Sequence, residues 1–189
     1  MSRGLGDVYK RQSFTVDDDT IVCLNRPPIP IGVTSSEAEY TYTWEHKDLN
    51  GNLSPFPTSG PTIDIGVGGT YYVTATTTDG TNCSRTLSID VEESIIATIT
   101  PNDITVEDLT SDNNNTITID PTNLGIGDYE YAIDDLTGPY QNDPFFEQVR
   151  PGIHTIYVRD KNGCGIAQID VSVIGYKKFF TPNGDGIHD

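Results

Sequence analysis

The sequence lacks the features that mark several protein classes. Its 11 basic residues are outnumbered by 28 acidic ones, so the formal net charge is −17. A field of this sign repels a phosphate backbone, and we therefore expect no nucleic-acid partner. No stretch approaches the roughly 18 to 20 apolar residues of a membrane span. The N-terminal region also has no apolar signal-peptide segment, so an exported chain of this kind is expected to be an internal piece of a longer protein.

Catalytic motifs are missing as well. The sequence has no Ser/His/Asp order around a nucleophile elbow, no Gly-rich phosphate loop and no histidine pair. Its three cysteines form no CxxC pair, which argues against a zinc knuckle. A nucleophilic Cys164 would need a base, but His154 falls on an inward-facing strand position and is expected to pack in a core. Isolated carboxylates can hydrolyse glycosides at the right separation, which a sequence cannot establish. We expect no enzyme.

What the sequence does contain is a pattern of short strands and turns. Aromatic residues occupy every second position of Tyr40-Thr41-Tyr42-Thr43-Trp44, so one face of this strand is apolar and the other carries threonine. The run from Gly69 to Thr76 alternates in the same way, with Tyr71, Val73 and Ala75 inward. A turn at Asp79-Gly80 follows. The pattern predicts an all-β chain.

The second half repeats the plan of the first. Gly152 opens a strand that matches the strand at Gly69, an offset of 152 − 69 = 83 residues, and Cys164 follows Cys83 by 164 − 83 = 81. A period of this size corresponds to a whole small sandwich domain. We predict domains at residues 13–93 and 94–175. Their separate cores are expected to hold Tyr42, Trp44, Val73 and Leu87 in the first and Tyr131, Ile156 and Val158 in the second.

The first twelve residues differ from the rest. They read MSRGLGDVYKRQ, are basic where the chain is acidic, and show no strand alternation. They resemble the adaptor sequence that sometimes contaminates metagenomic assemblies. We interpret residues 1–12 as a non-native leader, with a natural disordered leader as the alternative.

Two cysteines flank the single tryptophan. Cys23 shares the parity of Ile21, and Cys83 shares that of the apolar positions downstream, so both are expected to face the core near Trp44. The order Cys, Trp, Cys is that of an immunoglobulin sandwich, and it predicts two tandem immunoglobulin-like antiparallel β-sandwiches. A Cys23–Cys83 disulfide would close 83 − 23 = 60 residues, worth about 4 kcal/mol. Two free buried thiols are the alternative. We expect Cys164 to be a lone thiol.

The repeat unit resembles a known group of domains. The stretches at 42–44, 69–76 and 79–83 resemble PKD-like and immunoglobulin-like domains of large surface proteins in Bacteroidota. The stretch at 129–173 resembles the repeat of their gliding-motility adhesins. Those repeats usually have an earlier cysteine that pairs with the last one, and this sequence lacks it. The resemblance implies a place on the outer cell surface or outside the cell.

The end of the chain carries the most specific motif. Residues 173–189 resemble the opening of the gliding-motility-associated C-terminal domain, the type B sorting domain of type IX secretion, with His188 in place of the usual Asn. Roughly the first 15 residues of that domain are present, so we expect residues 176–189 to be its truncated start. The motif residues are Phe180, Thr181, Pro182, Asn183, Gly184, Asp185, Gly186 and Asp189.

The same segment presents a partial calcium-binding pattern. Asn183, Asp185 and Asp189 place side-chain oxygens at i, i+2 and i+6, and the glycines between them allow a tight turn. Calcium is therefore a possible ligand in the full-length protein, and a plain Gly-rich turn is the alternative. No other cofactor is expected.

These features together predict a non-catalytic structural or adhesive module of a large cell-surface or secreted protein. The resemblance implies type IX export and, as partners, neighbouring domains of the same chain, the secretion machinery through the complete C-terminal domain, and a surface polysaccharide or protein. The alternative is an accessory region of a secreted hydrolase whose catalytic domain lies upstream.

Overall fold

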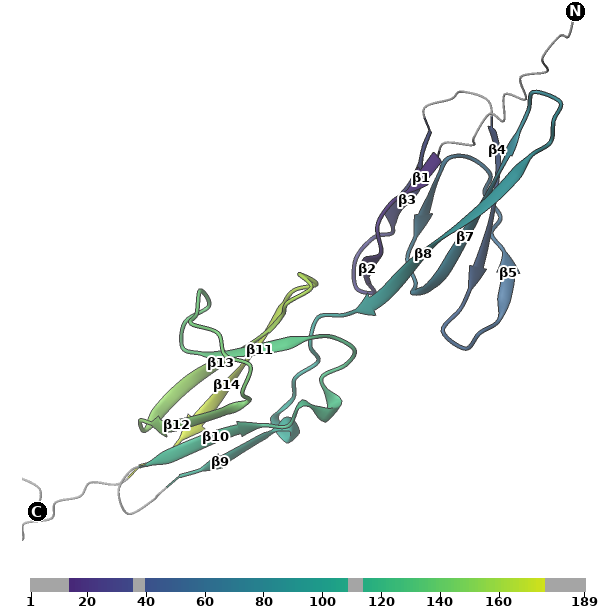
Figure 1. The fold of residues 1–189 in the computed structure, drawn as a ribbon. Coiled ribbons are helices and arrows are strands. Elements are labelled where there is room, and N and C mark those ends of the chain that lie inside the picture. Colours follow the sequence, from purple (N-terminus) through teal and green to yellow (C-terminus); the bar gives the residue numbers. More distant parts are fainter. Residues whose placement is uncertain (1–13, 36–39, 109–113, 176–189) are drawn as a thin grey trace, which may run out of the picture. The chain divides into compact units, whose positions relative to one another are not determined.

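A computed structural model describes residues 14–35, 40–108 and 114–175, and in these ranges the regular structure consists of strands and two short 3-10 turns (Figure 1). The chain divides between Glu93 and Ser94 into two units, here called unit 1 and unit 2. The predicted leader at 1–12 and the predicted sorting-domain start at 176–189 lie outside the described residues.

Unit 1 consists of two sheets. The first has the order β1 (Phe14–Val16), β3 (Ile29–Ser35) and β6 (Thr62–Ile65). The second has the order β2 (Thr20–Cys23), β8 (Ser84–Ser94), β7 (Gly69–Thr77), β4 (Tyr40–Lys47) and β5 (Leu53–Pro55). The pairs β1–β3, β3–β6, β4–β5, β4–β7 and β7–β8 are antiparallel.

The alternation of side chains that the sequence predicts locates the core of unit 1. Along β7, Tyr71, Val73 and Ala75 are fully buried while the residues between them are partly exposed. Trp44 on β4 faces Val73 on β7 and is 2% exposed, and its indole Nε1 donates a hydrogen bond of 2.9 Å to the Gly60 carbonyl. The four residues predicted for this core are confirmed, with Tyr42 and Leu87 at its partly buried margin.

Unit 2 also consists of two antiparallel sheets. One has the order β12 (Phe145–Val149), β10 (Asn115–Ile119) and β9 (Ile104–Glu107), and the other β11 (Tyr129–Ile133), β13 (Gly152–Asp160) and β14 (Ile166–Val173). The 3-10 turns η1 (Pro101–Asp103) and η2 (Pro121–Asn123) precede β9 and β11. Tyr131, Ile156 and Val158 lie in its core, as predicted.

The two units share one strand plan. With β2 and β5 set aside, the first, second and fourth strands of each unit form one sheet, and the third, fifth and sixth form the other. This is the division of strands A, B and E from strands C, F and G in an immunoglobulin sandwich. The chain therefore has two tandem immunoglobulin-like β-sandwiches. Unit 1 differs by the additional strand β2 beside β8 and the additional strand β5 beside β4.

Candidate functional site

The cysteines do not occupy the positions that strand parity predicts. Cys23 ends β2 and Cys164 lies in the β13–β14 turn, and both are disulfide-bonded. Cys83 is exposed in the β7–β8 turn, with its Sγ 4.0 Å from the carbonyl oxygen of Thr81. This corrects the predicted Cys23–Cys83 pairing and the predicted lone thiol at Cys164. Parity failed because β8 begins at Ser84, so Cys83 belongs to a turn and does not follow the strand's alternation.

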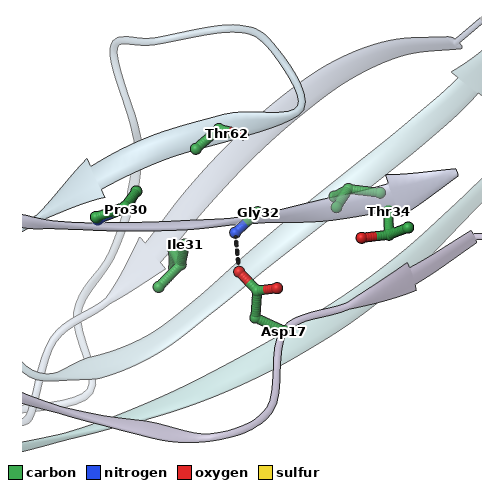
Figure 2. Close-up of a pocket in the computed structure, with 7 residues that line it drawn as sticks. Asp17, Pro30, Ile31, Gly32, Thr34 and Thr62 are labelled. Carbon is green, nitrogen blue, oxygen red and sulfur yellow. Dashed lines mark hydrogen bonds between the residues drawn. The ribbon is translucent and has the colours of Figure 1, made fainter.

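Unit 1 has a shallow groove beside β3 (Figure 2). Asp17 Oδ2 accepts a hydrogen bond of 2.6 Å from the Gly32 amide, and the Asp17 amide donates to the Gly32 carbonyl at 3.1 Å. The carboxylate thus continues the β1–β3 pairing beyond β1. A Cβ on Gly32 would lie 3.0 Å from the Pro61 carbonyl oxygen, so the strand passes close to the β6 side at this point. The groove volume is ≈ 190 Å³, smaller than ligand pockets of about 300–1,000 Å³.

His154 has a carboxylate partner. Its Nδ1 lies 2.7 Å from Asp134 Oδ2, and its Nε2 lies 2.7 Å from the Arg150 carbonyl oxygen. Both partners are acceptors, which suits an imidazolium that donates from both nitrogens. Partial burial, the largest single influence, lowers the pKa of His154, but the hydrogen bonds with Asp134 and Arg150 together raise that pKa above its ordinary value.

His154 and Cys164 do not form a catalytic pair. His154 faces Val171 near the end of β14, whereas Cys164 precedes the first residue of that strand. The separation from His154 to Asp160, beside the Cys164 turn, is six residues of strand, or roughly 20 Å. His154 shares the inward parity of Ile156 and Val158, as the sequence predicts, and its side chain is 13% exposed.

Asp160 is a buried carboxylate that the sequence did not reveal. It is 1% exposed, and it accepts hydrogen bonds of 2.9 Å from the Ser94 hydroxyl and 2.9 Å from the Cys164 amide. Its backbone carbonyl accepts from the Gly163 amide at 3.0 Å. Asp160 therefore fixes both the β13–β14 turn and the first residue of unit 2, which is a structural role.

The outer face of β13 carries a charged aromatic cluster. Arg159 Nε lies 2.6 Å from Glu130 Oε1, and the Arg159 guanidinium carbon lies 3.7 Å from the Tyr140 ring centroid. Tyr140 donates from its hydroxyl to the Leu136 carbonyl at 2.9 Å within the loop after β11, and the Arg159 contact joins that loop to the sheet. These charges satisfy one another within the unit.

The described residues hold no group of three or more His, Cys, Asp or Glu side chains arranged to bind a metal ion. Within the same ranges, no helix is long and apolar enough to cross a membrane. The sorting motif from Phe180 to Asp189 and the proposed calcium ligands Asn183, Asp185 and Asp189 lie outside those ranges. The polar groups described above serve to hold turns and strand ends in place.

Comparison with known proteins gives a distant likeness of fold. No protein-family model matches the chain, and no curated protein matches it. Among solved structures, murine CEACAM1b has a TM-score of 0.49 at 10% identity, over 87% of this chain and 100% of that one. The IG1+IG2 structure of DIP-gamma has a TM-score of 0.43 at 7% identity, over 87% and 98%. The fibronectin(III)-like modules of Clostridium thermocellum CbhA have a TM-score of 0.35 at 13% identity, over 86% and 95%. Such scores carry no argument about function, and the fold class rests on the strand order.

Proposed function

We propose that this chain is a non-catalytic structural or adhesive segment of a large cell-surface or secreted protein. The observation that carries the proposal is the repetition of one six-strand plan in two successive units, each with its own core. Many cell-surface domains share this sandwich architecture, and a series of such domains can serve as a stalk or display a binding surface.

Two further observations support this role. Disulfides persist in oxidising compartments, and Cys23 and Cys164 are disulfide-bonded, which fits a protein outside the cytosol. The carboxylates and the imidazole described above already have partners within their own unit: Asp160 has Ser94, His154 has Asp134, and Arg159 has Glu130. Each arrangement stabilises a turn or a loop.

The export route of the proposal rests on the C-terminal motif. The stretch from Phe180 to Asp189 resembles the start of a type B sorting domain, so we propose type IX secretion through the completed domain. A reporter fused to the completed domain should reach the medium or the cell surface in cells with a working type IX system and stay inside cells without one. Equal export from both strains would contradict this route. Calcium binding by Asn183, Asp185 and Asp189 belongs to the same completed domain, and titration of that domain with calcium tests it.

The structural role is tested by an in-frame deletion of residues 13–175 in the full-length protein. We expect the shortened protein to be exported normally while attachment of the cells to surfaces falls. Replacement of the same segment by two unrelated sandwiches distinguishes a structural stalk from an adhesive surface. If the segment is only a stalk, the replacement should restore attachment. If the segment itself binds the surface, attachment should stay low. Loss of a hydrolytic activity with unchanged attachment would contradict the proposal and favour an accessory region of a hydrolase.

A further inference from the structure

One strand edge in unit 2 stands apart from the other sheet edges. Natural sheets protect their edges with short strands, charges, prolines and bulges, because an open edge pairs with other chains. Among the described strands, β14 is an edge strand of eight residues, and its register with β13 runs without a shift from Val173 to Ile166. The other edge strands have three to five residues and are β1, β2, β5, β6, β9, β11 and β12.

The matching edge of unit 1 is covered. There β8 occupies the place that β14 occupies in unit 2, and β2 lies along its outer side. Val22 of β2 is 1% exposed and belongs to the core of unit 1, so this additional strand closes the sandwich at that edge. The described part of unit 2 contains no strand paired with the outer side of β14. Consistent with an open edge, the inward-facing Ala167 and Ile169 remain only half-buried.

The hydrogen-bond pattern shows which groups face outward. The Asp160 amide donates to the Gly165 carbonyl at 3.0 Å, so the pair one step before Arg159–Ile166 is hydrogen-bonded. Such pairs alternate in an antiparallel ladder, and the odd-numbered residues of β14 therefore bond to β13. The amide of Ile174, an even-numbered residue, donates instead to Asp108 Oδ2 at 2.8 Å, which agrees with this assignment. The backbone N–H and C=O groups that face the open edge, here called outward-facing, are therefore those of Ile166, Gln168, Asp170 and Ser172.

We propose that the β14 edge binds a second copy of this chain, strand to antiparallel strand, about a two-fold axis at Ile169. In this register Gln168 lies opposite Asp170 of the other copy, Ile166 lies opposite Ser172, and the inward-facing Ala167 lies opposite Val171. All four outward-facing residues then gain backbone partners, and the two Ile169 side chains meet at the axis and extend the apolar row.

Charge disfavours one of the two neighbouring registers. A shift of the axis to Asp170 would place two Asp170 carboxylates opposite each other, which is destabilising. With the axis at Ile169, the side-chain carboxamide of Gln168 can donate a hydrogen bond to the Asp170 carboxylate of the other copy. Asp170 Oδ1 already accepts from the Thr155 hydroxyl at 2.7 Å, which leaves Oδ2 for that bond. Each copy carries a net charge of −17, so added salt should strengthen the pairing.

Sedimentation equilibrium of the full chain over a range of concentrations tests the pairing, with a non-reducing gel to exclude disulfide-linked copies. Gln168→Pro removes a backbone N–H that faces the open edge. The hydrogen bonds to β13 are kept, because they come from the odd-numbered residues and edge strands tolerate proline on the open side. Gln168→Ser is the matched control that keeps the amide. We expect dimers from wild type and Gln168→Ser, and monomers from Gln168→Pro at an unchanged melting temperature. A wild-type monomer at all concentrations, or a Gln168→Pro dimer, would overturn the proposal.

A charge pair tests the register itself and does not depend on proline. Gln168→Lys places a cation opposite Asp170 of the other copy, and Gln168→Asp places a second anion there. We expect the lysine variant to dimerise several-fold more tightly than wild type and the aspartate variant several-fold more weakly, with the difference shrinking at high salt. Equal dimerisation of the two variants at low salt would show that position 168 does not face position 170, and the proposed register would be wrong.

Discussion

The hydroxyl of Ser94 donates a hydrogen bond of 2.9 Å to the buried carboxylate of Asp160, 66 residues further along the chain. Because the Cys164 amide donates to the same carboxylate, loss of the acceptor leaves two buried donors without a partner. We predict that Asp160→Ala lowers the free energy of unfolding of unit 2 by about 2–4 kcal/mol, as removal of one member of a buried polar cluster does. Chemical denaturation followed by amide hydrogen exchange would resolve unit 2 from unit 1.

A surface carboxylate of the same unit provides the control. Asp128 Oδ1 accepts a hydrogen bond from Lys161 Nζ at 2.9 Å, and its side chain is 65% exposed. Exposed ion pairs contribute little, so Asp128→Ala should change the stability by less than about 1 kcal/mol. Equal effects of Asp128→Ala and Asp160→Ala would show that the Asp160 cluster is not a structural anchor.

The pair of His154 and Asp134 predicts a dependence of unit 2 on pH. The pKa of His154 is raised in the folded chain, so folding is favoured by its protonation. That contribution is fully present below the unfolded pKa of about 6.5 and is lost as the pH rises through the higher folded pKa. We therefore expect the stability of unit 2 to fall as the pH is raised from slightly acidic to slightly alkaline.

NMR titration of the His154 ring gives the folded pKa directly. Asp134→Asn keeps a side-chain oxygen for the Thr155 amide, which donates to Asp134 Oδ1 at 3.1 Å, but removes the negative charge beside the imidazole. This variant should lower the pKa of His154 and flatten the pH dependence. An unchanged titration curve would mean that Asp134 does not stabilise the imidazolium.

Among the described residues, three turns contain the same Asp-x-Thr hydrogen-bond motif, at Asp79, Asp120 and Asp135. At Asp135, the carboxylate accepts from the Thr137 hydroxyl at 2.7 Å and from its amide at 2.8 Å, and these bonds lower the pKa of Asp135. The stabilisation is present above the unfolded pKa of about 3.9 and is lost as the pH falls through the lower folded pKa.

We predict that Asp135→Asn keeps the turn and removes its share of the acid sensitivity of unit 2, because an Asn oxygen accepts the same bonds without titrating. Acid denaturation of wild type and variant checks this expectation. The pH at the midpoint of unfolding should be lower for Asp135→Asn than for wild type. Equal midpoints would contradict the assignment.

Strand alternation explains which parts of the fold the sequence could predict. Trp44 and Val73 are neighbours on β4 and β7, and both were assigned to one core because a strand turns every second side chain to the same face. Gly69 and Gly152, matched by the repeat, both begin long strands and both have positive φ angles of 128° and 154°. Local pattern was sufficient at these places because local geometry decides them.

Strand alternation could not predict side-chain contacts between segments that are far apart in the sequence. Asp134 and His154 are 20 residues apart, and they meet because β11 and β13 are paired and Asp134 adopts a φ of 62° just after β11. Ser94 and Asp160, 66 residues apart, likewise meet only in the folded unit 2. The core position predicted for Cys83 was wrong because side-chain alternation holds only within a strand, and β8 begins one residue later, at Ser84.

The cysteines yield the last prediction. Cys164 is 2% exposed and Cys23 is half-buried, and both are disulfide-bonded, so neither thiol should react with an alkylating reagent before reduction, even in the denatured chain. Mass mapping of the chain purified from an oxidising compartment checks this, and the linked peptides identify the partner of each cysteine. After reduction both peptides should take the label, and the melting temperature should fall because the crosslink no longer restricts the unfolded chain. Alkylation of Cys164 in the unreduced, denatured protein would show instead that it is the lone thiol that its position in the repeat first indicated.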